Sequence, residues 1–102
     1  MSDSIVVVGM ARTPLGGMQG SLSDMTASDL GAKALAAALE RSQVAAEDVS
    51  ETIMGCVLPA GVGQAPARQA SLGAGMPLST GATTINKVCG SGMKAVMLGM
   101  DI

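Results

Sequence analysis

The segment from residue 82 to residue 102 places the strongest restriction on the fold of this chain. Residues 83–88 are β-branched at four of six positions, which is typical of a short strand. From Ser91 onward the apolar residues recur at helical spacing. One face of that helix carries Met93, Val96, Met97 and Met100, and the opposite face carries Ala95, Leu98, Gly99 and Ile102. Because a helix that is apolar on both faces is normally enclosed by other elements, we expect this helix to be buried.

Cys89 lies at the junction between the predicted strand and the predicted helix. The first turn of a helix presents free N–H groups and the positive end of the helix dipole, which stabilise a thiolate, the nucleophilic form of cysteine. Gly90 and Gly92 lack Cβ atoms, so a substrate can come close to the backbone there. We therefore predict that Cys89 is a catalytic nucleophile and that its own N–H is an oxyanion donor. The alternative is a small packed thiol, the usual role of a free cysteine.

The same glycines also fit a second motif. Gly90, Gly92 and Ala95 match the pattern G-x-G-x-x-A, which binds dinucleotides when it follows a strand and opens a helix. The acidic residue that holds the ribose in such sites lies about 20 residues further on, outside this sequence. A dinucleotide-binding, Rossmann-like oxidoreductase segment therefore stays open as an alternative.

Composition argues against several classes of function. The chain has 102 residues, enough for one domain at most, and contains no Phe, Tyr or Trp. A formal net charge of −2 and the lack of aromatic side chains argue against nucleic-acid binding. No apolar run reaches the roughly 18–20 residues of a membrane span, and the N-terminus lacks the features of a signal peptide. With no histidine and only two cysteines, we expect no metal site and a cytoplasmic location.

The rest of the chain predicts further strands and helices. Residues 5–8 form a continuous β-branched run, which predicts a strand buried on both faces of a parallel or mixed central sheet. Thr26 and Asp29 form a capping-box pattern that should start a helix running to about Arg41. A second strand is expected over residues 51–58.

A third helix is expected to begin at Pro66, because a missing N–H costs nothing in the first helical turn. Ala67, Ala70 and Leu72 should form its packed face, and it should end near Gly73 or Gly75. The alternation of strands and helices predicts a layered α/β fold. Since the apolar run is still in progress at residue 102, we expect these residues to be the opening part of a longer protein or a piece that requires a partner.

Three separated motifs resemble those of the thiolases, the acetyl-CoA acetyltransferase family. The first, Ala11-Arg-Thr-Pro14, follows the predicted first strand, and the second is Gly63-Gln-Ala-Pro-Ala-Arg-Gln-Ala70. The third, Asn86-Lys-Val-Cys-Gly-Ser-Gly-Met-Lys-Ala95, contains Cys89. Because the motifs occur in the family's order and span nearly the whole chain, the resemblance implies that Cys89 is the residue that becomes acylated.

The resemblance implies both a fold and an activity. The fold would be layered α/β and thiolase-like, with a mixed central sheet and a buried helix after the nucleophile; residues 1–102 would be a partial N-terminal domain. The activity would be acyl transfer between coenzyme A thioesters, by Claisen condensation or thiolysis through an acyl-cysteine. Acyl-CoA is then a substrate, and no cofactor is implied. The full-length protein would be a homo-oligomer, a dimer or a tetramer, in fatty acid metabolism.

The resemblance also implies that parts of the site lie outside this chain. The family's activating histidine and its second catalytic cysteine belong to its C-terminal half. Cys56, inside the predicted second strand, does not match that second cysteine, and we interpret it as an inert packed thiol. Residues 1–102 alone are therefore expected to be inactive. Ketoacyl-synthase-type condensing enzymes and a non-catalytic α/β module stay open as further alternatives.

Overall fold

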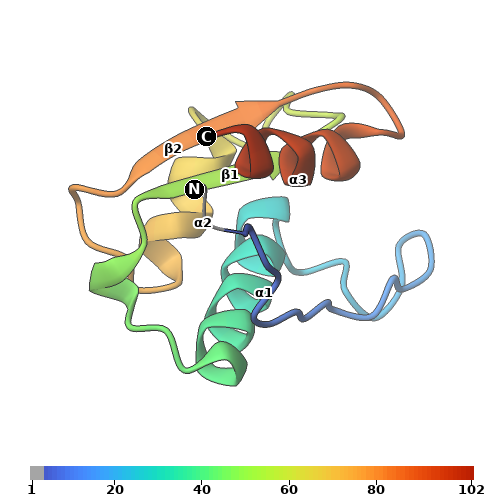
Figure 1. Ribbon diagram of the computed structural model, residues 1–102. Helices are drawn as coiled ribbons and strands as arrows, with labels where there is room; N and C mark the ends of the chain where they lie inside the picture. Colours follow the sequence, from blue (N-terminus) through green and yellow to red (C-terminus); the bar gives the residue numbers. More distant parts are fainter. Residues whose placement is uncertain (1–3) are drawn as a thin grey trace.

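The computed structural model describes residues 4–102, which form a small α/β unit (Figure 1). The elements follow the order α1 (Ala27–Ser42), the 3-10 turn η1 (Ala46–Asp48), β1 (Glu51–Gly55), α2 (Pro66–Gly73), β2 (Gly81–Ile85) and α3 (Ser91–Asp101). In this part of the chain β1 and β2 pair in parallel, with Thr52 opposite Ala82 and Met54 opposite Thr84. The α/β prediction is confirmed, whereas the sheet formed by residues 4–102 is purely parallel and not mixed.

The alternation of side chains along β1 creates three layers. Thr52 donates a hydrogen bond of 3.2 Å to Ser71 on α2, so the even-numbered side chains point toward α1 and α2. Ile53 lines a hollow with Ala95 and other residues of α3, so the odd-numbered positions face α3. The sheet therefore lies between α1 and α2 on one side and α3 on the other.

Small residues fill the layer between α1, α2 and the sheet. A Cβ atom added at Gly31 of α1 would lie 3.1 Å from the Cβ atom of Ala70, so the two helices pack closely. Ala67 and Ala70 are 1% and 2% exposed, as predicted, but Leu72 is 40% exposed. Hydroxyl groups share this core with apolar groups. The buried polar residues of the described chain are Ser28, Thr52, Ser71, Thr80 and Ser91.

All three predicted helix starts are confirmed, and α3 begins at Ser91. Thr26 accepts a hydrogen bond from the N–H of Asp29 (3.0 Å), and the Asp29 carboxylate accepts one from the N–H of Thr26 (3.1 Å). This capping box satisfies two N–H groups that a helix start leaves free. Pro66 occupies the first turn of α2. The predicted second strand is shorter than expected, since β1 ends at Gly55.

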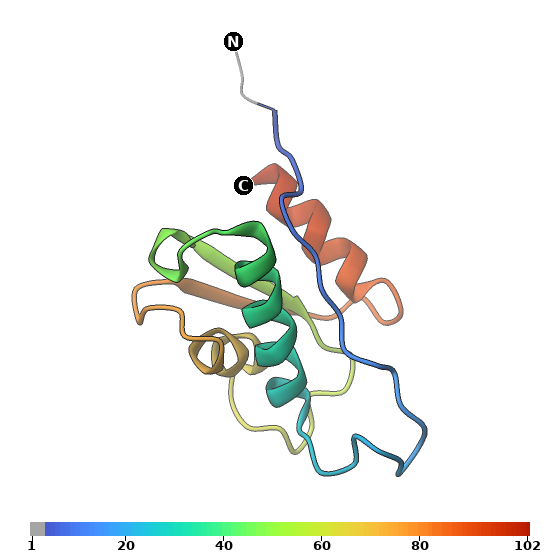
Figure 2. The ribbon, with the colours of Figure 1, turned by 90° about the horizontal axis from the view of Figure 1, so that it is seen from below.

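The strand predicted over residues 5–8 is wrong. The described structure shows no strand there, and the side chains from Ile5 to Val8 are 62–74% exposed. A β-branched run favours an extended backbone, but a strand also needs a hydrogen-bonded neighbour. The segment runs between α1 and α3 (Figure 2). Just after the segment, the Arg41 guanidinium of α1 donates a 3.0 Å hydrogen bond to the carbonyl of Met10.

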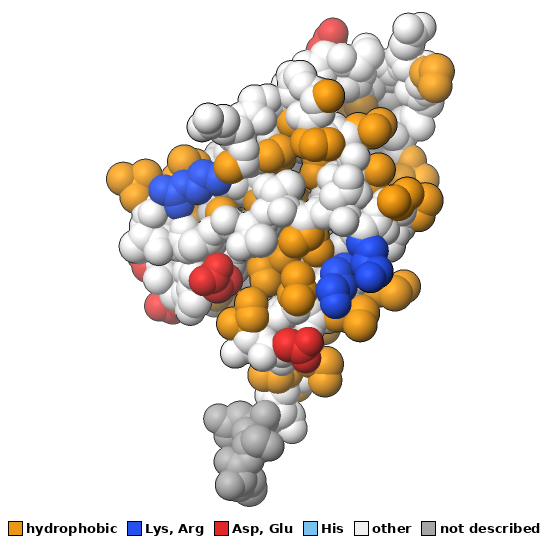
Figure 3. All heavy atoms as spheres, turned by 90° about the horizontal axis from the view of Figure 1, so that it is seen from above, with side chains coloured by type: hydrophobic (Ala, Val, Ile, Leu, Met, Phe, Trp, Pro, Cys, Tyr) orange, Lys and Arg blue, Asp and Glu red, His pale blue; other side chains and the backbone are white. Residues whose placement is uncertain are grey.

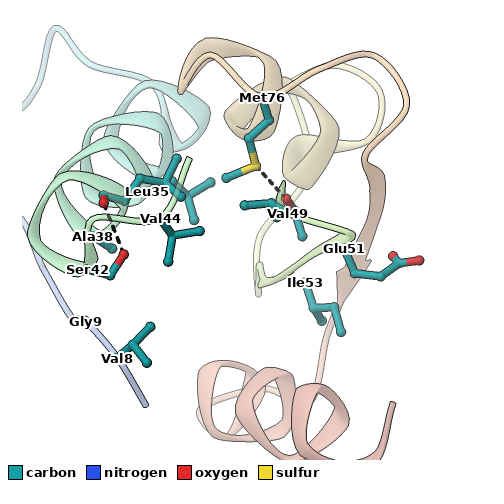
Figure 4. A pocket seen from close by; sticks show the side chains of 12 residues that line it. Val8, Gly9, Leu35, Ala38, Ser42, Val44, Val49, Glu51, Ile53 and Met76 are labelled. Atoms are coloured by element: carbon teal, nitrogen blue, oxygen red, sulfur yellow. Dashed lines mark hydrogen bonds between the residues drawn. The ribbon is translucent and has the colours of Figure 1, made fainter. Parts of the chain in front are cut away.

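An apolar pocket of about 330 Å³ separates this segment from the sheet (Figure 4). Val8 and Gly9 border it on one side, Leu35 and Ala38 of α1 on another, and Ile53 and Met76 close it toward the sheet and α2. The segment therefore reaches the body of the protein without pairing to the edge of β1.

The buried environment expected for α3 is also not observed. Ala95 and Leu98 are half-buried on the side that faces the sheet, but the opposite face is open. Its side chains, Met93, Val96, Met97 and Met100, are 73%, 69%, 51% and 67% exposed. Hydrophobic side chains are spread over the side of the molecule seen from above (Figure 3). A helix with two apolar faces needs a layer on each side, and residues 4–102 provide one.

Candidate active site

Cys89 lies in the short connection between β2 and α3, at the end of the sheet where both parallel strands finish. Ligands of open parallel sheets bind at this carboxyl end. The thiol of Cys89 is free and exposed. The structure therefore confirms its predicted place at a strand-to-helix junction, and its exposure disagrees with the alternative of a packed thiol.

The backbone immediately before Cys89 is strained. Val88 has a φ of +48°, in the left-handed region that a β-branched side chain rarely adopts. Such a conformation costs about 1–3 kcal/mol and persists only where the surroundings hold it. Strain of this kind is concentrated at functional sites, and here it turns the chain from β2 into α3 around the thiol.

Two side chains bond the backbone of the strained turn. The Ser91 hydroxyl donates to the carbonyl of Val88 (2.7 Å) and accepts from the N–H of Lys87 (2.8 Å). The Asn86 amide oxygen accepts from the N–H of Val88 (2.9 Å), and its NH₂ group donates to the carbonyl of Val57 (3.1 Å). Two backbone bonds complete the turn, from Gly90 to Lys87 and from Ser91 to Val88. The peptide groups before Cys89 are thus held on all sides.

The N–H groups that follow the strained turn differ from those within it in their hydrogen bonding. Among residues 4–102, no acceptor bonds the N–H of Cys89, Gly92 or Met93. The N–H groups of Gly92 and Met93 belong to the first turn of α3, where the helix dipole is positive. An oxygen that develops negative charge beside the thiol would therefore find free donors.

Gly55 allows the first turn of α3 to lie against the end of β1. A Cβ atom added at this last residue of β1 would lie 2.6 Å from the carbonyl carbon and the Cβ atom of Ser91, and 2.8 Å from the nitrogen of Gly92. The end of β1 is therefore in direct backbone contact with the first turn of α3. Only glycine permits this approach, which fixes the helix start relative to the sheet.

The second resemblance motif supports β2 and the preceding turn. The N–H of Ala67 donates to the Thr84 hydroxyl (2.9 Å), which joins the start of α2 to β2. The Arg68 guanidinium donates to the carbonyls of Thr80 (2.8 Å) and Leu78 (2.9 Å). These contacts hold the strand that leads to Cys89. By contrast, Arg12 of the first motif donates only to the carbonyl of the next residue, in an irregular segment.

Cys56 is at the same end of the sheet as Cys89. It follows the last residue of β1, and its N–H donates to the carbonyl of Ile85 (2.9 Å). Its thiol is free and half-buried. The prediction that Cys56 lies inside the strand is therefore wrong by a small margin, because the strand stops one residue earlier.

The sequence interpretation did not identify Ser91 or the left-handed conformation of Val88 as parts of this site. Serine at a helix start commonly bonds nearby backbone groups, and that tendency is the only signal that could have indicated Ser91. Nothing in the identity of a valine indicates a positive φ.

Residues 4–102 contain no group of three or more His, Cys, Asp or Glu side chains placed to hold a metal ion. No helix within them combines the length and apolarity that crossing a membrane requires.

Comparison with known proteins identifies the family. The model of the family described as "Thiolase, N-terminal domain" matches residues 5–102. Acetyl-CoA acetyltransferase B, mitochondrial, of Xenopus laevis is 56% identical over 96 residues, which are 94% of this chain and 23% of that protein. Acetyl-CoA acetyltransferase 2 of Arabidopsis thaliana is 58% identical over 94 residues, 92% of this chain and 23% of that protein.

Solved structures show the same similarity. The crystal structure of Acat5 thiolase from Ascaris suum in complex with coenzyme A matches 92% of this chain and 25% of its own, with a TM-score of 0.89 and 39% identity. An acetyl-CoA acetyltransferase from Syntrophomonas wolfei matches 94% of this chain and 24% of its own, with a TM-score of 0.88 and 39% identity. The chain thus spans about a quarter of the length of these relatives. It belongs to the thiolase family.

Proposed function

We propose that these residues are the N-terminal part of a longer acetyl-CoA acetyltransferase, in which Cys89 carries the acyl group between coenzyme A thioesters. The observation that supports this most is the position of Cys89. Its thiol is exposed at the carboxyl end of a parallel sheet, beside free N–H groups at the start of α3. Relatives that are 56–58% identical carry the name acetyl-CoA acetyltransferase.

In the proposed first half-reaction, the Cys89 thiolate attacks the carbonyl carbon of acetyl-CoA. A carbon–sulfur bond forms to Cys89, the bond to the coenzyme A sulfur breaks, and coenzyme A leaves as its thiolate. The tetrahedral intermediate places negative charge on the former carbonyl oxygen, which the unbonded N–H of Cys89 would stabilise. One thioester replaces another, so this step loses little free energy.

In the proposed second half-reaction, the α-carbon of another acetyl-CoA loses a proton, and the resulting carbanion attacks the acetyl-cysteine. The products are acetoacetyl-CoA and the regenerated Cys89 thiolate; the reverse sequence is thiolysis. Residues 1–102 contain no histidine to activate Cys89, and we interpret their other cysteine, Cys56, as an inert packed thiol, so neither residue type supplies the base for this proton transfer here. We propose that it lies in the further part of the protein, as the resemblance to thiolases implies.

Replacing the two cysteines in turn tests this assignment in the full-length protein. Cys89→Ser should abolish acetoacetyl-CoA thiolysis, because an alcohol is a far weaker nucleophile than a thiolate at neutral pH. Cys56→Ser is the matched control, since it makes the same substitution at the other free cysteine and should retain activity. Full activity in C89S would contradict the proposal.

Assays of the full-length protein also distinguish two alternative functions. A ketoacyl-synthase-type enzyme would condense an acyl-cysteine with a malonyl thioester and would not need to deprotonate acetyl-CoA. A dinucleotide-binding segment using Gly90, Gly92 and Ala95 would bind NADH or NADPH, and fluorescence titration of the reduced nicotinamide ring detects that binding. We expect condensation of acetyl-CoA and no nicotinamide binding, because the matching family is that of the thiolases.

Assembly and location are also proposals. We propose a homodimer or homotetramer, as the resemblance to thiolases implies. Light scattering of the full-length protein tests the assembly. We propose a cytoplasmic location, and imaging of the tagged full-length protein tests it, with mitochondrial targeting as the contrary outcome.

A further inference from the structure

We propose that the side chains of Ser91 and Asn86 are positioning residues for Cys89: they hold Val88 in its left-handed conformation and thereby aim the thiol and the N–H of Cys89. The proposal deepens, and rests on, the acyl-transfer function proposed above. Neither residue needs to touch substrate. Their effect on catalysis is carried through the backbone of Lys87 and Val88.

The hydrogen bonds of the turn support this division of roles. The two peptide groups of Lys87 and Val88 contain four polar atoms, and each one has a partner. Ser91 bonds the Lys87 N–H and the Val88 carbonyl, Asn86 bonds the Val88 N–H, and the Gly90 N–H donates to the Lys87 carbonyl. Bonding stops at Cys89, whose N–H has no acceptor within residues 4–102. Hydrogen bonds therefore fix the turn as far as Val88, and they leave the N–H of Cys89 available to an oxyanion.

The two side chains are anchored to different segments near the end of β1. Ser91 is 2% exposed and lies against the backbone of Gly55, so its hydroxyl cannot move away from the turn. Asn86 is exposed, but its NH₂ group donates to the carbonyl of Val57, beyond the end of β1. The turn is therefore fastened to α3 through Ser91 and to the segment after β1 through Asn86. A strained residue needs this kind of external support, because it would otherwise relax.

The test compares variants of the full-length protein. Ser91→Ala removes the hydroxyl, and the expected result is a kcat for acetoacetyl-CoA thiolysis lower by about 10- to 100-fold, because misplacement of a reacting group by about 1 Å has effects of that size. KM should stay within about twofold, since Ser91 does not bind substrate and its loss affects the alignment of the reacting groups in the transition state. Ser71→Ala is the matched control: it removes a buried hydroxyl from α2, where Ser71 is 0% exposed, and should leave kcat unchanged.

A second substitution separates positioning from general stability. Asparagine adopts the left-handed conformation more readily than valine, and the Val88 side chain is 64% exposed, so Val88→Asn removes the strain with little loss of packing. If Ser91 acts by holding that conformation, S91A should lower kcat much less in the V88N background than in the native one. A purely structural role would give the same loss in both backgrounds.

Each outcome decides between the two proposals. If S91A does not fold, the exposed Asn86→Ala carries the test, and an unchanged kcat in N86A overturns the positioning role. The positioning role is also overturned if S91A has the kcat of S71A, or if S91A loses the same kcat with and without V88N. In either case, acetylation of Cys89 in the unmodified protein would leave the proposed acyl-transfer function intact. If Cys89 of the unmodified protein is not acetylated, the proposed function itself fails.

Discussion

Gly55→Ala is the substitution for which the structure gives the clearest magnitude. The added Cβ atom would lie 2.6 Å from two carbon atoms of Ser91 and 2.8 Å from the nitrogen of Gly92. Carbon atoms in ordinary contact are about 3.5–4.0 Å apart, so the start of α3 must retreat by about 1 Å. Overpacking of this kind costs about 1–3 kcal/mol of unfolding free energy. A retreat of about 1 Å beside the nucleophile should also lower kcat by up to about 10²-fold.

Thermal unfolding and steady-state thiolysis of the full-length protein measure both effects. Gly17→Ala is the matched control, because no atom lies within 4 Å of a Cβ added at that exposed loop glycine. We expect G17A to match the unmodified protein and G55A to lose both stability and kcat. A G55A protein with the melting temperature and kcat of G17A would show that β1 and the start of α3 are not in the contact described, and the account of the site would be wrong.

Three further predictions concern the helices and the isolated chain. Thr26→Ala should lower the unfolding free energy by about 1 kcal/mol through loss of the capping box, with S23A in the preceding loop as control; equal stabilities would contradict the cap's role. Amide exchange of the α3 backbone should be among the slowest in the full-length protein if its methionine face is covered there, and fast exchange would contradict this. Residues 1–102 alone should show no thiolase activity, because each missing acid–base group typically contributes about 10²- to 10⁴-fold to the rate. They should also not be a monodisperse monomer in light scattering. Turnover by these residues would contradict the proposed origin of the base.

Local signals predicted the helix starts and the place of Cys89 well. The pair Thr26 and Asp29, and the proline at residue 66, act on backbone groups within a few residues of themselves. Their effect does not depend on which elements come together later. The same holds for the junction at Cys89, where a β-branched run gives way to helical spacing and glycines.

Predictions that depend on distant partners were less successful. The β-branched run of residues 5–8 required a neighbouring strand, and α3 required a layer over each apolar face. An apolar sequence pattern indicates that such a strand edge or helix face must be covered, but it does not indicate which element covers it. For this reason the extended conformation and the helix were predictable, whereas their pairing and burial were not.

The internal geometry of the site was the least predictable part. The left-handed φ of Val88 results from the hydrogen bonds of Ser91 and Asn86 together with the contact between Gly55 and the start of α3. These groups come from β1, the connection and α3, and only the assembled unit brings them together. The packed face of α2 shows the same limit, because the sequence predicted Ala67, Ala70 and Leu72 there, whereas Ser71 is buried and Leu72 is 40% exposed.

Mass mapping of the acetyl group tests the central claim most directly. The full-length protein is incubated with acetyl-CoA, quenched in acid to preserve thioesters, digested, and its cysteine-containing peptides are measured. The account predicts a gain of one acetyl group on the peptide that carries Cys89, none on the peptide that carries Cys56, and loss of the label when free coenzyme A is added before the quench. An acetyl group on Cys56, or an unlabelled Cys89 in protein that turns over acetyl-CoA, would contradict it.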